Sequence, residues 1–292
     1  MMRSHRLTVF LTVAISSLVV PAIASAEELK TNPVEEFLLE PWVPIHLGPL
    51  DLSINKGVFY LALAGLLAVG GTLLIVRGGL KLHPGRMQAV AELIYDFAEG
   101  QIGRAALPEK IFKTWFPYLA TLFVFILANS FISFMPLPTD TKHLYLGFIP
   151  GPAFYAATSN ISVTLALGLV TFFASHVVGI RHNGVVGYFK SWFPDIKGPV
   201  NLLIVPIEIL SQLLRLVSLP VRLFANMLAG HMLIIMCIAM IIIIGNWAVA
   251  IATVPIGAAF YVFEFLLVGN LQAFIFALLS GIYIGGAADP HH

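Results

Sequence analysis

Residues 213–240 read "LLRLVSLPVRLFANMLAGHMLIIMCIAM", an apolar stretch that carries two arginines, an asparagine and a histidine. No two-residue turn signal interrupts it, although Pro220 can kink a helix. Apart from a few charged positions, the sequence stays apolar from Val200 to Ile284, and Asn246 is its one strong polar break. Each half of roughly 40 residues would be about 60 Å long as a helix, twice the hydrocarbon thickness. Two pairs of ordinary spans would fit, but the missing turn signals favour two long, steeply tilted helices.

The composition identifies an integral membrane protein. Of 292 residues, 59% are hydrophobic and 11% are charged, and the mean hydropathy is +0.92. The formal net charge of +1 gives no indication of a nucleic-acid partner. The single cysteine, Cys237, lies in an apolar run and supports neither a disulfide framework nor a metal cluster. The sequence has no Walker-type loop, dinucleotide glycine fingerprint or HExxH motif, so we expect no cofactor and no metal.

Three further apolar segments precede the long pair. Residues 58–76, 115–135 and 161–180 are each about long enough to cross a hydrocarbon core. Between the first two, residues 82–110 have apolar residues at helical spacing against charged ones, which predicts an amphipathic helix on the cytoplasmic side of the membrane. The apolar set is Val90, Leu93, Ile94, Phe97 and Ile102, and the charged set is Arg86, Glu92, Asp96 and Glu99. We therefore predict an all-α polytopic membrane protein with five membrane helices and one amphipathic helix.

The N-terminus has the pattern of a secretory leader. Arg3 and Arg6 precede an apolar run that ends in the small residues Ala24-Ser25-Ala26. This predicts a signal peptide over residues 1–26, cleaved after Ala26, with an uncleaved first helix as the alternative.

Basic residues set the expected orientation. Two segments, 77–113 and 181–197, hold nine lysines and arginines, whereas the mature N-terminal stretch and residues 136–160 hold three. The positive-inside rule then places the basic segments in the cytoplasm of a bacterium and the mature N-terminus outside its inner membrane. We expect an extracytoplasmic segment over 27–57, a membrane domain over 58–285 and a cytoplasmic tail over 286–292.

Ionisable side chains at membrane depth are the candidate functional residues. A charge at a helix centre costs about 2.5–3.5 kcal/mol on insertion scales, so such residues are rare unless they have a function. Glu264 is favoured as functional because the last helix has no cation to pair with it. The ionisable set is Glu208, Arg215, Arg222, His231 and Glu264, with Gln212, Asn226, Asn270 and Gln272 as neutral partners.

The helical period assigns faces to these residues. Glu208, Arg215 and Arg222 follow at intervals of seven, so they drift by only about 20° per step and form one stripe. Asn226 lies about 40° from Arg222, whereas His231 falls about 180° away. Arginine stays protonated and can act only as a fixed charge, whereas histidine titrates at about pH 6.5 and suits a proton relay. Two simpler interpretations stay open: Arg215 as a structural or snorkelling partner of Glu208, and His231 as a satisfied core histidine.

Several segments together resemble one known family. "PVRLFANMLAGH" is similar to the signature of subunit a of the F-type ATP synthase, the stator channel subunit beside the rotating ring of c subunits. "TWFPYLATLFVFILANSFISFMP", "SVTLALGLVTFF" and "LQAFIFALLSGIYI" resemble the family's second, third and last membrane segments in the same order, so the likeness covers most of residues 50–286.

The resemblance implies a proton channel of two offset half-channels that couples proton flow to rotation and ATP synthesis, with no catalytic site of its own. It implies the c ring, b-type peripheral stalk subunits, the whole ATP synthase complex and membrane lipid as partners. By position, Arg222 matches the essential arginine that faces the ring carboxylate, and Asn226 the polar residue after it. His231 matches a position with Glu or His in the outer access channel, Glu208 the cytoplasmic-side acid, and Gln272 the glutamine opposite the arginine. Arg215 and Gln212 are possible supports.

The chain departs from the family pattern at two sites, and its leader is not a general feature of the family. Family members usually carry an acid or histidine seven residues before the glutamine, but Phe265 stands there and Glu264 is eight before. This offset turns Glu264 by about 100° unless a local bulge restores the register. Asn160 stands where the third segment usually has an acid, which leaves His231, Glu264 and Asp140 for the outer channel.

Two rival functions remain at this point. A stand-alone secondary transporter could use Arg222 to bind an anion, but we find no inverted repeat to support it. A purely structural membrane anchor would leave the ionisable residues unexplained.

Overall fold

The computed structural model describes residues 39, 41–47, 50–51, 53–77, 81, 83–145, 149–190 and 201–289. Five of the described helical segments are long and apolar enough to cross a membrane, which confirms the all-α polytopic class. They are α2 (Lys56–Arg77), α5 (Glu109–Ser133), α6 (Ile161–Lys190), α7 (Asn201–Ile244) and the C-terminal rod, which joins α8 (Trp247–Phe263), η4 (Glu264–Val268) and α9 (Gly269–Ala288). The predicted signal peptide, residues 1–26, lies outside the described residues.

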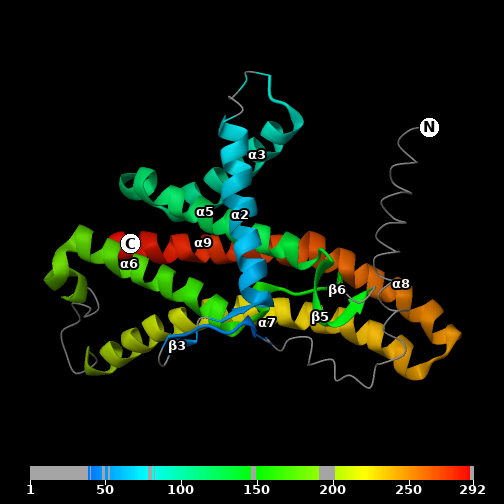
Figure 1. Cartoon of the computed structure of the whole chain (residues 1–292). Helices are drawn as coiled ribbons and strands as arrows, with labels where there is room; N and C mark the ends of the chain where they lie inside the picture. The colour runs from blue at the N-terminus through cyan, green and yellow to red at the C-terminus, as the bar shows by residue number, and fades with distance from the viewer. Residues whose placement is uncertain are drawn as a thin grey trace.

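The last two helical segments are as long as the sequence predicts. Helix α7 has 44 residues and the C-terminal rod has 42. At about 1.5 Å per residue, each exceeds 60 Å, so neither can fit upright in a hydrocarbon core of about 30 Å. Figure 1 shows α7 and the rod lying side by side and crossing the direction of α2. The alternative of two pairs of ordinary spans is wrong.

A two-residue turn joins the two long segments. Gly245 adopts a φ of 61°, a left-handed conformation that glycine reaches without strain. Asn246 then caps α8, because its Oδ1 accepts a hydrogen bond from the backbone N–H of Ala248 at 3.0 Å. The polar break that divides the apolar sequence is therefore the tip of a helical hairpin.

The two central spans differ from their predicted limits. Helix α5 begins at Glu109, directly after Pro108, and so carries its first charged turns ahead of the apolar stretch. Helix α6 continues past Arg181 to Lys190, but Gly184 breaks it with φ 71° and ψ 162°. The break falls at the last residue of the "HNG" sequence, residues 182–184.

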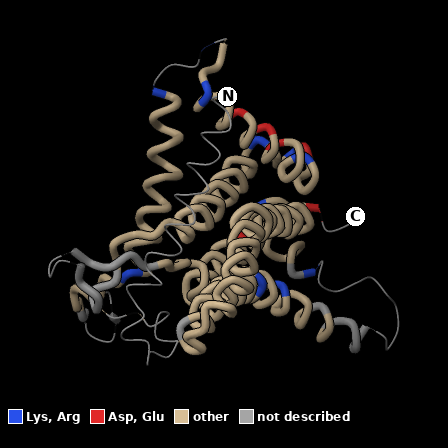
Figure 2. Tube along the Cα trace, turned by 90° about the vertical axis from the view of Figure 1, so that its right-hand side faces the viewer, with Lys and Arg blue, Asp and Glu red and all other residues tan. Residues whose placement is uncertain are grey.

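A π-helical turn divides the amphipathic segment into two α-helical parts. The segment consists of α3 (Arg86–Phe97), the π-helical turn η2 (Ala98–Gly103) and α4 (Arg104–Ala106). Leu93 of the predicted apolar face is 70% exposed, whereas Ile102 is fully buried in the core. Figure 2 shows charged residues gathered along this segment and sparse on the long helices. The exposed half of the apolar face is free to meet lipid, as an interfacial helix requires.

Short strands lie in the connections between the described helices, and they form only two-stranded sheets. Strand β1 (Pro41–Val43) pairs with β4 (Ile54–Asn55), and β2 (His46–Leu47) with β3 (Leu50–Asp51). Strands β5 (Leu137–Tyr145) and β6 (Ile149–Ala153) form an antiparallel hairpin before the short helix η3 (Ala157–Ser159). These three elements lie between the predicted membrane segments 115–135 and 161–180.

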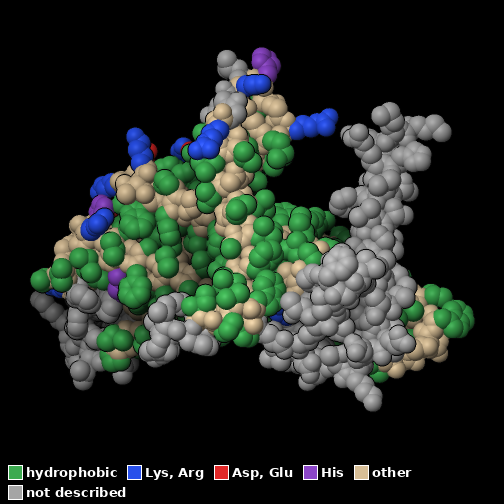
Figure 3. Space-filling view, viewed as in Figure 1, with side chains coloured by type: hydrophobic (Ala, Val, Ile, Leu, Met, Phe, Trp, Pro, Cys, Tyr) green, Lys and Arg blue, Asp and Glu red, His purple; other side chains and the backbone are tan. Residues whose placement is uncertain are grey.

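Close helix contacts depend on small residues. The main core joins α5, α6, α7 and α9 through buried side chains such as Leu119, Leu223 and Phe276. A Cβ at Gly168 of α6 would overlap with the ring of Pro220 on α7. Such small residues let membrane helices approach closely where burial of apolar surface provides no driving force. Figure 3 shows hydrophobic side chains spread over the visible outer face, as expected of a surface in contact with lipid.

Candidate functional site

Helix α7 presents its polar residues on two sides, as the helical period predicts. Arg222 and Asn226 are exposed, whereas His231 is only 3% exposed. Within the described part of the chain, Arg222 has neither an ion pair nor a hydrogen-bond partner. A guanidinium with five donors thus stands on the outer surface of α7, next to the exposed Asn226.

A hydrogen bond between helices fixes the amides beside Arg222. The Asn226 Nδ2 group donates to Gln272 Oε1 at 2.8 Å, which ties α7 to α9. Gln272 is 2% exposed, so this contact satisfies an amide that would otherwise be buried without a partner. The structure therefore brings two of the four predicted neutral partners together on the side of α7 that carries Arg222.

The opposite side of α7 carries a buried histidine–carboxylate pair. His231 Nδ1 lies 3.2 Å from Glu264 Oε1 and 3.1 Å from the carbonyl oxygen of Met227. Nε2 faces the carbonyl oxygen of Ser133 at 3.5 Å. Glu264, like His231, is only 3% exposed.

This geometry allows one proton to sit on either member of the pair. Carbonyl oxygens only accept hydrogen bonds, so a doubly protonated His231 beside an ionised Glu264 can donate from both ring nitrogens. If the proton moves to Glu264, its O–H can donate to Nδ1 while Nε2–H still faces Ser133, but Nδ1 then gives up its hydrogen bond to the carbonyl oxygen of Met227. Glu264 Oε2 is buried and has no partner among the described residues. The contact therefore allows a proton to be shared between the imidazole and the carboxylate.

A π-helical turn begins at Glu264. Segment η4 starts at Glu264, and the N–H of Gly269 donates to the carbonyl oxygen of Glu264, five residues back. Such a turn contains one more residue than an α-helical turn. A local bulge is thus present where the one-residue offset of Glu264 required one.

Gly230 makes room for the carboxylate. A Cβ at this position would overlap with the side chain of Glu264, at 2.5 Å from Oε2 and nearer to Oε1. Only the three-dimensional structure reveals this contact between Gly230 and the acid.

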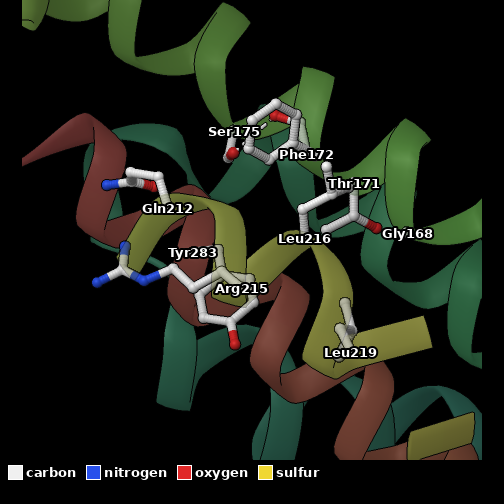
Figure 4. A pocket seen from close by; sticks show the side chains of 9 residues that line it. All are labelled: Gly168, Thr171, Phe172, Ser175, Gln212, Arg215, Leu216, Leu219 and Tyr283. Carbon is white, nitrogen blue, oxygen red and sulfur yellow. Dashed lines mark hydrogen bonds between the residues drawn. The ribbon is translucent and has the colours of Figure 1, made fainter. Parts of the chain in front are cut away.

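A pocket opens between α6, α7 and α9 beside Arg215, which lies seven residues before Arg222 on the same stripe of α7. The guanidinium of Arg215 lies over the ring of Tyr283, with 5.5 Å between Cζ and the ring centroid. Figure 4 shows Arg215, Gln212 and Tyr283 on one side of the pocket, and Thr171 and Ser175 of α6 on the other. The remaining lining residues are Gly168, Phe172, Leu216 and Leu219.

A buried row of hydroxyl groups adjoins this pocket and was not predicted. Tyr118 OH lies 3.0 Å from Thr171 Oγ1, which in turn lies 3.4 Å from Ser280 Oγ. Hydroxyl groups both donate and accept, so such a row can relay hydrogen bonds across α5, α6 and α9. No charge or spacing pattern marks these residues in the sequence.

Two predicted residues are placed only in part. The side chains of Glu208 on α7 and Asp140 on β5 lie outside the described part of the structure, although the backbone of Asp140 pairs with Gly151. The proposed Arg215–Glu208 pair therefore stays a prediction. Asn270 donates to the carbonyl oxygen of Leu266 on its own helix.

Asn160 has a structural contact where the family has an acid. Its Oδ1 accepts from the N–H of Ser162 at 2.8 Å at the start of α6. Burial raises the pKa of nearby Tyr155 to about 12, although its hydrogen bond with Asn160 opposes the shift. The phenol of Tyr155 therefore stays neutral at physiological pH.

The charged residues do not assemble into a metal site. Within the described ranges, no three His, Cys, Asp or Glu side chains gather in a way that could hold a metal ion.

Comparison with known proteins identifies the family of this chain. The family model described as "ATP synthase A chain" matches residues 58–285. The chain is 34% identical over 279 residues to ATP synthase subunit a of Hyphomonas neptunium, covering 93% of this chain and all of that protein. It is 32% identical over 272 residues to ATP synthase subunit a of Bradyrhizobium diazoefficiens, covering 90% of this chain and all of that protein. It is 35% identical over 255 residues to ATP synthase subunit a of Rubrobacter xylanophilus, covering 84% of this chain and 88% of that protein. The chain therefore belongs to the ATP synthase subunit a family and is a multi-pass membrane component of an ATP synthase.

Proposed function

We propose that this subunit forms two offset half-channels against a rotating ring of c subunits in an F-type ATP synthase. A proton enters from outside near His231 and Glu264 and binds a carboxylate of the ring. After almost a full rotation, it leaves to the cytoplasm past Glu208. Membership of the family supports this proposal, and so does the separation of the buried acid–base pair from the exposed arginine.

The exposed position of Arg222 is the observation that carries the proposal. A lone cation at membrane depth costs about 2.5–3.5 kcal/mol, so an apolar lipid environment is a poor partner for it. Ser218, Ala225 and Ala229 are exposed on the same side of α7, and small residues allow a second helix to approach closely. A helix of the c ring that carries a carboxylate would pack against these small residues. It would also place a negative charge opposite Arg222.

Arg222 then has two roles in the proposed mechanism. Its permanent charge stabilises the ionised carboxylate of the passing ring subunit. The same charge repels a proton that would otherwise cross directly between the half-channels. Rotation is driven by about 2.3 kcal/mol per elementary charge for each 100 mV of membrane potential, before any pH difference is added.

The remaining assignments follow from the same proposal. The subunit has no catalytic site of its own, and it sits in the bacterial inner membrane with its mature N-terminus outside and its C-terminus in the cytoplasm. The exposed apolar face of α3 lies on the cytoplasmic side of the lipid, where b-type peripheral stalk subunits also approach.

Substitution of Arg222 tests the proposal directly. We expect Arg222→Ala to abolish ATP-driven proton pumping in inverted membrane vesicles while the complex still assembles. Arg222→Lys also fails, because lysine lacks the planar fork of donors and loses its proton readily in an apolar setting. Arg104→Ala, which removes an exposed cation that pairs with Glu99 on the amphipathic segment, is the control and keeps pumping. Native pumping by assembled Arg222→Ala would refute the assignment.

The family relationship does not favour a stand-alone transporter. Co-purification separates the two possibilities, because only the proposed subunit is recovered from membranes together with a c ring and a peripheral ATPase. Purification of an active, solitary transporter would reverse this conclusion.

A further inference from the structure

Two polar contacts tie α7 to the C-terminal rod, and both use residues on one side of the rod. Gln272 contacts Asn226, and Glu264 contacts His231. Glu264 and Gln272 are separated by eight positions. In an uninterrupted α-helix, eight positions turn through about 80° beyond two full turns, so the two side chains would point to different neighbours.

The π-helical turn η4 removes this discrepancy. It spans Glu264–Val268, within the interval between the acid and the amide. Because a π-turn takes up one extra residue, eight positions advance through nearly the same rotation as seven positions of an α-helix. Seven positions leave a mismatch of only about 20°, so both side chains face α7.

The turn keeps Phe265 out of the His231–Glu264 pair. The ring of Phe265 packs edge-on against Phe131 and Phe134 of the α5 end, with centroid separations of 5.1 Å and 5.7 Å. Phe134 also lies 5.0 Å from the ring of His231. Phe265 is thus part of an aromatic layer beside the pair, and a carboxylate at this position would be placed among phenyl rings.

Neighbouring helices hold the turn in place at both ends. At its end, a Cβ on Gly269 would stand 2.9 Å from the Cβ of Ser130 on α5, so the two backbones are in close contact. At its start, the carboxylate of Glu264 occupies the space left by Gly230 on α7. Tyr261, one turn earlier, donates its hydroxyl to the carbonyl oxygen of Phe134 at 2.8 Å.

We infer that η4 is the positioning element of the proton-uptake site: its one extra residue aligns Glu264, and not Phe265, with His231 and Gln272. Glu264 is then the group that exchanges the proton with His231, and the turn acts through Glu264 without touching the proton. This inference rests on the proposed proton-channel function. It adds that Glu264 is the acid and that η4 is the element that orients its side chain.

Two variants of opposite design test the alignment. Deletion of Val268 removes the extra residue, so an ordinary α-helix would place Glu264 seven positions before Gln272 and pumping stays close to the native rate. The double substitution Glu264→Phe/Phe265→Glu keeps the length but moves the acid into the aromatic layer. Its pumping falls by about 100-fold or more, to the level of Glu264→Gln, as expected when a proton-transfer group is removed. Native pumping by the double variant, or loss of pumping in an assembled Val268 deletion, would overturn the inference.

Cross-linking gives a readout that does not depend on proton transport. In a Cys237→Ser background, a short bifunctional thiol reagent links His231→Cys to Glu264→Cys but not to Phe265→Cys in the assembled complex. Preferential linkage to position 265 would contradict the alignment. If the cross-links form as expected but Glu264→Gln pumps normally, the alignment stands and the proposed uptake role of Glu264 is refuted.

Discussion

Gly230→Ala is expected to disable proton uptake by displacing a carboxylate that the substitution itself does not alter. The new Cβ would stand 2.5 Å from Glu264 Oε2, whereas ordinary contact begins at 3.4 Å, so the carboxylate must retreat by about 0.9 Å or more. The distance of 3.2 Å between His231 Nδ1 and Glu264 Oε1 then exceeds the range of a hydrogen bond.

The size of the effect follows from the contact that is lost. Hydrogen bonds to charged groups contribute about 1.5–3 kcal/mol, and about 1.4 kcal/mol corresponds to a factor of ten in rate. ATP-driven pumping in inverted vesicles should therefore fall by about ten- to a hundredfold. Passive proton flow through vesicles stripped of the peripheral ATPase should fall in parallel.

Two comparisons make this prediction specific. Gly71→Ala in α2 is the matched control, because a Cβ there meets nothing within 4 Å and pumping should be native. Adding Glu264→Asp to Gly230→Ala shortens the acid by one methylene and should restore part of the rate. Native pumping by an assembled Gly230→Ala variant would show that the carboxylate does not need its present position.

Two predictions concern packing. Asn226→Ala leaves the buried Gln272 amide without its hydrogen bond, and we expect thermal unfolding of the detergent-solubilised complex to show a loss of about 1–3 kcal/mol, whereas an unchanged midpoint would contradict the contact. Gly168→Ala forces α6 away from Pro220 and should cost about 1–3 kcal/mol in the same assay. Gly70→Ala, in open space on α2, is the control.

Much of the architecture was predictable because membrane helices have strong and simple signals. The uninterrupted apolar run around Pro220 predicted a long helix, and Asn246 predicted its end, since an asparagine offers a cap where the backbone turns back. The separation of Arg222 from His231 also followed from the helical period alone. These features are local, so the sequence contains them directly.

The remaining features depend on contacts between distant segments. A fixed rotation of about 100° per residue cannot anticipate η4, because the π-turn is stabilised by the packing of Phe265 and Gly269 against α5. The contact between Gly230 and Glu264 joins positions 34 apart in the sequence and leaves no periodic trace. The hydroxyl row that starts at Tyr118 consists of ordinary residues that only the fold brings together.

The tight turn at Gly245 and Asn246 also has a consequence for how the subunit is made. Because no loop separates the two long segments, the membrane insertion machinery receives them as a single helical hairpin. Glu264 can meet His231, and Asn226 can meet Gln272, before either segment is released sideways into lipid. Residues that would be costly to insert one at a time can then enter as hydrogen-bonded pairs, whereas Arg222 has no such partner among the described residues.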